Sequence, residues 1–400
     1  MPLTLSKICT GIMPSATLRL NAIVAELRAQ GQDIISLAAG EPDFDTPANI
    51  VSAANKAMAE GGTHYTAVSG LPQLRQAICD CLFEEKGLVY QKANIIVGTG
   101  AKQVLYEALR AIVNQGDEVI LPAPCWLSYA EMVGMVGGKA VLVAADDMNN
   151  YVPKMHDIAK KVTPRTKVIL INSPNNPTGA VWNMEALRGI AEIAQDKDIW
   201  IISDEIYEKM VYGGARHISI ASLSPDAKER TIVVSGLSKA YAMTGWRLGY
   251  AAGPASVIKE MDAYQSHATG NANSIAQFAG VEALKGPQDS VHAMVRAFER
   301  RRALMLDCIK KVPGVTYRAP QGAFYVLLNV SACIGKRYLN TLVSDDTVFS
   351  ELLLQHARVS VVPGAPFFAP SHVRLSYAVS EEKIVEGIRR MAQFVQEIID

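Results

Sequence analysis

Lys239 and Asp204 could carry out nucleophilic or acid–base chemistry, and each lies shortly after the end of a short apolar run. Lys239 lies within Ser-Gly-Leu-Ser-Lys-Ala-Tyr-Ala-Met-Thr-Gly-Trp-Arg, among small and aromatic residues. Such surroundings would remove water from the amine and favour its neutral, nucleophilic form. Taken singly, Lys239 could be a solvated surface lysine, and Asp204 could be a helix N-cap, because aspartate is a favoured capping residue.

Further polar groups follow other apolar runs, where ligands bind in doubly wound sheets. The segment Gly98-Thr-Gly-Ala-Lys102 precedes a helical pattern, so it could hold a phosphate at a helix N-terminus or be a plain turn. It does not fit a nicotinamide fingerprint, because Gln103 stands where the third glycine belongs, and it lacks the Gly-Lys-Ser/Thr of a P-loop. The segments Pro122 to Trp126 and Ser173 to Gly179 are the other candidates.

The elements that must position these groups indicate an α/β fold. Short β-branched runs alternate with amphipathic helical stretches between Asn94 and Gly253, which predicts a mostly parallel sheet with helices on both faces. The expected strands are Ile95 to Gly98, Glu118 to Leu121, Val168 to Asn172, Trp200 to Ser203, Thr231 to Ser235 and Leu248 to Ala252, with helices at Gln103 to Val113 and Met184 to Gln195. A long helix near Asp289 to Lys311, mixed strands and a final helix from Glu381 to Ile399 predict a second, smaller α+β domain.

Composition excludes several classes of protein. The 39 basic and 39 acidic residues give a formal net charge of +0, so neither nucleic acid nor an anionic membrane is an expected partner. The polar N-terminal segment lacks the apolar core of a signal peptide, and no stretch is apolar enough for a membrane span, so we expect a cytoplasmic protein. The six cysteines and seven histidines show no metal-ligand spacing, so we expect free thiols and no metal site.

Seven motifs, in order, resemble fold-type I, class I aminotransferases of the bacterial aspartate and aromatic aminotransferase subgroup. The resemblance covers essentially all 400 residues. The motifs are Pro14-Ser-Ala-Thr17, Ala39-Gly-Glu-Pro-Asp-Phe-Asp-Thr-Pro47, Tyr65-Thr-Ala-Val-Ser-Gly70, Ser173-Pro-Asn-Asn-Pro-Thr-Gly179, Ser203-Asp-Glu-Ile-Tyr207, Ser238-Lys-Ala-Tyr-Ala-Met-Thr-Gly-Trp-Arg247 and Val373-Arg-Leu-Ser-Tyr377. The resemblance implies a large domain over residues 46–286, a small domain built from residues 1–45 and 287–400, and a homodimer with shared active sites.

The resemblance also implies a cofactor, pyridoxal 5′-phosphate, held as an aldimine on Lys239. Lys239 would then move the substrate's Cα proton, and Asp204 would keep the pyridine nitrogen protonated, so that the ring acts as an electron sink. Asn176 and Tyr207 would donate hydrogen bonds to the phenolate oxygen, and Trp126 would stack on the ring. The phosphate would contact Gly100, Ala101, Arg247 and Tyr65 from a neighbouring subunit.

For the substrate, the resemblance implies that Arg374 binds the α-carboxylate, next to the backbone of Gly40 and to Asn176 and Trp126. Ser15, Thr17 and Lys102 would meet the distal carboxylate of aspartate. Cys125 stands where relatives commonly have tyrosine, and Gly270 interrupts a Ser/Thr-rich stretch. Both departures could admit a larger side chain, or could only repack.

We therefore expect transamination, with L-aspartate and 2-oxoglutarate as the substrates that the retained residues favour. An aromatic or prephenate aminotransferase is the alternative within the same fold. A β-lyase is a second class of enzyme that this scaffold could form, and the retained carboxylate-binding residues argue against it. A non-catalytic regulator is a third, and 400 residues leave no room for the DNA-binding domain that such proteins add.

Overall fold

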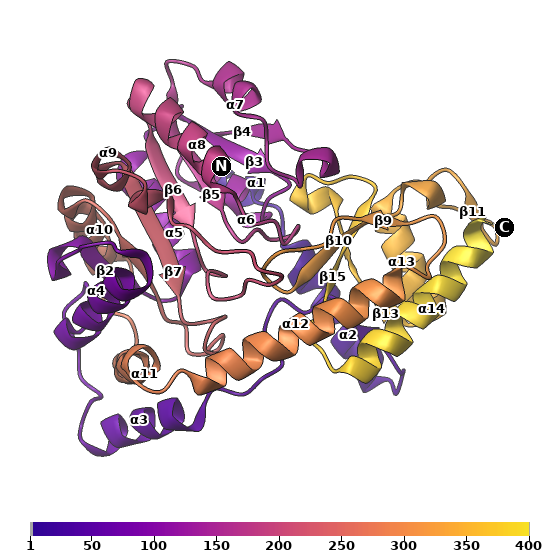
Figure 1. Cartoon of the computed structure of the whole chain (residues 1–400), viewed down its shortest axis with the longest axis horizontal. Coiled ribbons are helices and arrows are strands. Elements are labelled where there is room, and N and C mark those ends of the chain that lie inside the picture. The colour runs from indigo at the N-terminus through magenta and orange to yellow at the C-terminus, as the bar shows by residue number, and fades with distance from the viewer. Residues whose placement is uncertain (1–2, 400) are drawn as a thin grey trace.

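The central element is a seven-stranded sheet, seen in a computed structural model that describes residues 3–399 (Figure 1). Residues 1, 2 and 400, which belong to the predicted small domain, lie outside the described residues. The strand order is β2-β8-β7-β6-β5-β3-β4, and β8 runs antiparallel to the other six strands. The strands are β2 (Ile95–Gly98), β3 (Glu118–Ala123), β4 (Lys139–Ala144), β5 (Thr166–Asn172), β6 (Trp200–Asp204), β7 (Thr231–Gly236) and β8 (Gly249–Ala252).

Helices cover both faces of this sheet, because successive side chains of each strand point to opposite faces. On β6, Ile201 packs into the hydrophobic cluster that includes Leu187 of α8, whereas Ile202 packs into the cluster that includes Leu105 of α5. The predicted mostly parallel mixed sheet between helices is confirmed. The helices are α3 (Ala48–Ala59), α4 (Pro72–Lys86), α5 (Ala101–Ile112), α6 (Ser128–Met135), α7 (Met155–Lys161), α8 (Met184–Asp196), α9 (Pro225–Glu229), α10 (Ala255–Ala268) and α11 (Ser274–Lys285).

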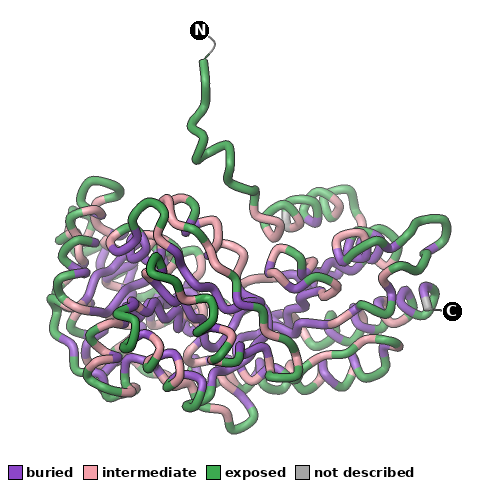
Figure 2. The backbone as a smooth tube through the Cα atoms, turned by 90° about the horizontal axis from the view of Figure 1, so that it is seen from above, coloured by how far each residue is buried: buried purple, intermediate pink, exposed green. Residues whose placement is uncertain are grey.

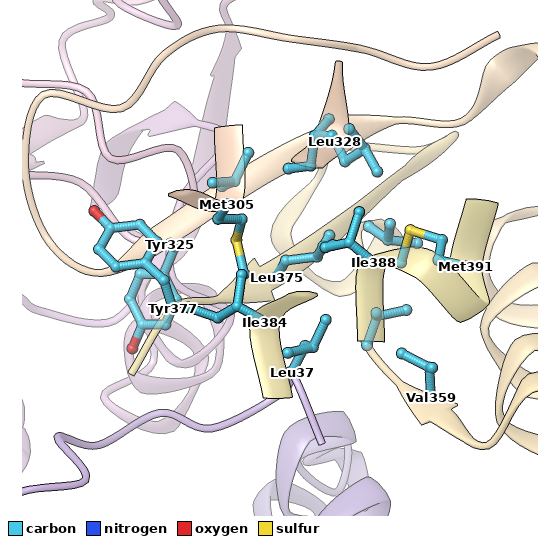
Figure 3. Packing of buried hydrophobic residues seen from close by; sticks show 14 of the residues in the cluster. Leu37, Met305, Tyr325, Leu328, Val359, Leu375, Tyr377, Ile384, Ile388 and Met391 are labelled. Atoms are coloured by element: carbon cyan, nitrogen blue, oxygen red, sulfur yellow. The ribbon is translucent and has the colours of Figure 1, made fainter. Parts of the chain in front are cut away.

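A smaller, antiparallel sheet lies alongside α12 (Asp289–Ile309), which begins beside the helices of the large sheet and whose Met305 and Ile309 pack into the core of the smaller sheet (Figure 1). Its strand order is β14-β15-β10-β9, and it shares a core with the C-terminal helix, where Leu375 and Ile388 pack with Leu37 (Figure 3). The elements are β9 (Thr316–Tyr317), β10 (Tyr325–Asn329), β14 (Val362–Pro363), β15 (His372–Ser376), α13 (Asp346–Ala357) and α14 (Glu381–Ile399).

The N-terminal residues join this smaller unit. β1 (Ile35–Ser36) pairs in parallel with β13 (Val359–Ser360), and the backbone N–H of Ser376 donates to the Leu37 carbonyl at 2.7 Å. The remaining elements are α1 (Lys7–Gly11), α2 (Ala16–Ala29), β11 (Arg337–Tyr338), β12 (Thr341–Leu342) and short 3₁₀ segments at Lys92–Asn94, Asp147–Asn149, Ile220–Ser222, Ser331–Cys333 and Ala365–Phe367. None of the helices within residues 3–399 has the length and apolar character needed to cross a membrane.

A buried ion cluster fixes the end of the central strand β6. Lys86, the last residue of α4, donates to Glu205 at 2.6 Å and also pairs with Glu208. His217 Nε2 lies 3.0 Å from the same Glu205 oxygen, and the hydroxyls of Ser203 and Ser219 donate to the other oxygen. Burial acts to lower the pKa of Lys86, but the two carboxylates outweigh it and the pKa is raised. The lysine therefore stays charged in the interior.

We expect Lys86→Met to lower the free energy of unfolding by about 3–5 kcal/mol, because it leaves two buried carboxylates without their cation. Urea denaturation followed by fluorescence measures this change. Lys56→Met is the matched control, because Lys56 forms only an exposed pair with Glu60 at 3.9 Å, worth less than about 1 kcal/mol. Equal urea midpoints for the two variants would contradict the structural role of Lys86.

Candidate active site

The predicted site residues gather around one cavity of about 300 Å³ at the carboxyl ends of β5, β6 and β7. This location is where a doubly wound sheet binds its ligands. The predicted residues that line it are Ser15, Thr17, Gly40, Ala101, Lys102, Trp126, Asn176, Asp204, Tyr207, Lys239, Arg247 and Arg374. Gly100 lies directly beside this lining, at the N-terminus of α5, whereas Tyr65 is 98% exposed on the surface.

Lys239 follows β7, and its amine bonds to a backbone carbonyl. Its Nζ donates to the carbonyl of Gly40 at 2.6 Å. Burial lowers the pKa of Lys239 to about 8, and Arg374 and Arg247 act in the same direction, whereas Glu41 opposes them. A substantial fraction of the amine is therefore neutral near pH 8, as nucleophilic chemistry requires.

Asp204 ends β6, and donors from two different elements hold its carboxylate. Oδ2 accepts the hydroxyl hydrogen of Tyr129 at 2.6 Å, and Oδ1 accepts the backbone N–H of Ile206 at 3.1 Å. Burial raises the pKa of Asp204 to about 6, although both hydrogen bonds and Lys239 act to lower it. The carboxylate is therefore ionised at neutral pH, inside the protein and close to the cavity.

Arg374 on β15 is buried with one nitrogen unused. Its Nη1 donates to Asn176 Oδ1 at 2.9 Å and its Nη2 donates to the carbonyl of Ala38 at 3.2 Å. The guanidinium lies between two aromatic rings, with Cζ 4.3 Å from the centroid of Tyr325 and 5.0 Å from that of Phe367. Nε has no hydrogen-bond partner among the described residues. Arg374 lines the cavity, and a buried guanidinium in that position is suited to bind a small anion.

The turn before α5 provides a second site for an anion. Gly100 has a φ of 83°, a backbone conformation that favours glycine, and the Arg247 guanidinium lies directly beside it: a Cβ at Gly100 would be 2.5 Å from Nη2. The first N–H groups of α5 have no intrahelical acceptor, and the helix dipole favours negative charge at this end. The turn, the N–H groups and Arg247 together fit a phosphate group.

The three residues predicted to meet the distal carboxylate of the substrate, Ser15, Thr17 and Lys102, also line the cavity. Ser15 caps α2, because its Oγ accepts the N–H of Leu18 at 3.5 Å, and Thr17 lies in the first turn of this helix. Lys102 Nζ lies 4.7 Å from the centroid of the Trp126 ring. Burial, and then Arg247, lower the pKa of Lys102. One basic and two hydroxyl side chains thus line the same cavity.

The lining residues that were not predicted from the sequence include Tyr129, Tyr325 and Asn172. Tyr129 contacts Asp204, and Tyr325 Oη lies 2.9 Å from Tyr207 Oη. Asn172 donates to the Asp204 carbonyl at 2.9 Å and accepts the N–H of Asn176, so it links two strand ends. Asn172 could have been predicted as a site residue, because it is a polar residue at the end of an apolar strand. Each tyrosine fitted a position in the hydrophobic core as well as it fitted a position in the site.

Both departures from the family pattern lie outside the cavity lining. Cys125 is only 3% exposed and packs in the hydrophobic cluster that includes Tyr129 and Leu105. Gly270 follows α10 and has a φ of 76°. A Cβ at this position would have no atom of the same subunit within 4 Å. Within one subunit, Cys125 therefore packs behind the residues that line the cavity and does not contact the cavity itself.

Fold and cavity together define an enzyme of the α/β class that places a desolvated amine, a buried carboxylate and an anion-binding arginine around one small substrate site. The sequence matches the family described as aminotransferase class I and II over residues 32–391. The chain belongs to this aminotransferase family.

Relatives and solved structures agree with this membership. An aspartate aminotransferase of Geobacillus stearothermophilus is 44% identical, over 98% of this chain and 99% of its own. An aspartate/prephenate aminotransferase of Cereibacter sphaeroides is also 44% identical, over 98% of both chains. The crystal structure of the aspartate aminotransferase from Rhizobium meliloti superposes with a TM-score of 0.95 at 40% identity, and covers 99% of this chain and 100% of that one.

We expect Asp204→Asn to raise the melting temperature of the cofactor-free protein by about 2–5 °C at pH 8. The raised pKa of Asp204 means that the wild type loses stability as the pH rises from about 4 to about 6. Asparagine removes this cost, and Tyr129 can accept from its amide N–H instead of donating.

Thermal unfolding at pH 8 and pH 5 measures the effect, and the gain should shrink at pH 5. Asp198→Asn is the control, because the Asp198 side chain is fully exposed. A melting temperature that is unchanged or lower at pH 8 would contradict the electrostatic cost assigned to Asp204.

Proposed function

We propose that the protein is a pyridoxal 5′-phosphate-dependent aminotransferase that transfers an amino group between L-aspartate and 2-oxoglutarate. The observation that carries the proposal is the convergence of Lys239, Asp204 and Arg374 on one cavity. The names of the relatives point to the same reaction.

The residues around the cavity fit the cofactor. Gly100, Ala101 and Arg247 would hold its phosphate, and Asp204 would pair with its ring nitrogen. Trp126 would cover one face of the ring, and Asn176 and Tyr207 would contact its phenolate oxygen. Bound at Lys239, the cofactor supplies the electron sink that allows a bond at the substrate's Cα to break.

Lys239 is then the group that moves the proton. Its lowered pKa lets the neutral amine accept the Cα proton and return it, which is general acid–base catalysis by one side chain. The Gly40 carbonyl, which accepts from Nζ at 2.6 Å, would retain the released amine near the cavity. Arg374, which lines the cavity, would bind the substrate α-carboxylate through its guanidinium and thereby orient the Cα–H bond toward Lys239.

The preference for aspartate rests on Ser15, Thr17 and Lys102, which could meet a second carboxylate. Prephenate is a second candidate, because several relatives are named aspartate/prephenate aminotransferases and prephenate also carries a second carboxylate. The buried position of Cys125 gives no added room for an aromatic ring at the cavity surface.

We expect aspartate alone to convert the cofactor's absorption band in the loaded enzyme, and phenylalanine to do so more slowly. Lys239→Ala should lower turnover by about a thousandfold or more, because the proton-transferring amine is lost. Exposed Lys259 provides the matched control, Lys259→Ala. An enzyme without a cofactor band would contradict the proposal, and faster conversion by phenylalanine would contradict the choice of substrate.

We further propose that the protein is a homodimer whose sites are completed by Tyr65 of the second subunit. Tyr65 is 98% exposed within one subunit, although tyrosine usually buries its ring. Residues 3–14 are all exposed and project away from the rest of the subunit (Figure 2), and they include Leu3, Leu5 and Met13. Such exposed apolar groups are suited to cover a second copy of the chain.

Mixed dimers should separate the two contributions. Tyr65→Ala and Lys239→Ala subunits, each defective alone, should form a mixed dimer with about half of the wild-type activity, because one of its two sites keeps both residues. Co-expression with two affinity tags isolates this dimer. A mixed dimer no more active than the average of the two variants would contradict the shared site.

A further inference from the structure

Tyr129 contacts two groups that flank the cavity from one position on α6. Its side chain is 1% exposed. Its hydroxyl donates to Asp204 Oδ2 at 2.6 Å, and its ring meets the Trp126 ring edge to face, with centroids 5.4 Å apart and planes at 87°. The first contact concerns the carboxylate, and the second concerns the ring that would cover the cofactor.

The hydroxyl of Tyr129 is a permanent donor. Burial and the adjacent Asp204 raise the pKa of Tyr129 well above its usual range, so the phenol remains protonated at any working pH. The backbone N–H of Ile206 holds the other oxygen of Asp204. With donors on both oxygens, from α6 and from its own chain segment, the plane of the carboxylate is fixed.

We propose that Tyr129 is a positioning residue of the proposed reaction, whose hydroxyl holds the Asp204 carboxylate ionised and aimed at the cofactor's ring nitrogen. The inference rests on the proposed function, since it assigns a purpose to Asp204 only when the cofactor is bound. A carboxylate that keeps its negative charge holds the proton on the ring nitrogen, whereas a more basic one would take the proton back. Tyr129 therefore supports the electron-sink character of the ring without touching the substrate.

A role in packing alone is the competing explanation, and one substitution separates the two. Tyr129→Phe keeps the edge-to-face contact with Trp126 and removes only the hydroxyl. Tyr212→Phe is the matched control: Tyr212 is 2% exposed and its hydroxyl donates to the Ala323 carbonyl at 2.7 Å, away from the cavity. Glu205, Lys239 and Tyr207 also act on the charge at Asp204, and both variants keep them.

The first measurement is the affinity of the cofactor-free protein for pyridoxal 5′-phosphate between pH 5 and pH 9. We expect Tyr129→Phe to bind about tenfold more weakly, because a hydrogen bond to a charged group is lost. The midpoint of the pH dependence should move upward, since Asp204 loses a donor that favours its ionised form. Tyr212→Phe should match the wild type.

The second measurement is the nitrogen-15 chemical shift of the ring nitrogen in protein loaded with ring-labelled cofactor. We expect the wild type to show a protonated nitrogen at pH 8 and Tyr129→Phe to shift toward the unprotonated value, with kcat lowered and the KM for aspartate unchanged. Unchanged affinity and unchanged nitrogen shift in Tyr129→Phe would overturn the proposal, even if thermal stability falls. Failure of the wild type itself to bind the cofactor would overturn the proposed function, and this inference with it.

Discussion

Two consecutive buried carboxylates at the end of the central strand set the geometry of the whole site. Asp204 is the last residue of β6 and reaches the cavity, whereas Glu205 enters the ion cluster with Lys86. Because neighbouring side chains of an extended chain point to opposite sides, a shift by one residue would exchange these environments. Lys86 and Tyr129 each complement one carboxylate, so together they specify the register of this strand end.

The cavity brings together charged groups whose burial lowers the stability of the fold. Burial lowers the pKa of Lys239 to about 8 and raises that of Asp204 to about 6, and Arg374 keeps a donor without a partner among the described residues. Each state costs stability, and the hydrophobic clusters on both faces of the large sheet offset it. Ligands of opposite charge would stabilise the charged forms of Lys239 and Asp204 and would pair with the Arg374 guanidinium, which is the pattern expected of a binding site.

Sequence patterns predicted the buried strands well, because a strand covered on both faces is a continuous apolar run. The edge strand β4 was not predicted: its residues are mostly exposed or half-buried, so its sequence carries no such run. Lys239, Asp204 and Arg374, which the motifs singled out, line one cavity, yet Tyr129 and Tyr325 could not be told from core residues without knowing which way their hydroxyls point. The roles of these residues and the division into two domains stay predictions, as does the contribution of Tyr65, which depends on a second chain.

Residues 38–40 connect the amine and the guanidinium of the site. The Gly40 carbonyl accepts from Lys239, and the Ala38 carbonyl accepts from Arg374. This segment continues from β1, which is held against β13, so it belongs to the N-terminal part of the chain while Arg374 belongs to the C-terminal part. The site therefore exists only when both ends of the chain are packed together beside the large sheet. Any movement of the smaller sheet against the larger one would change the position of Arg374 and the environment of Lys239 at the same time.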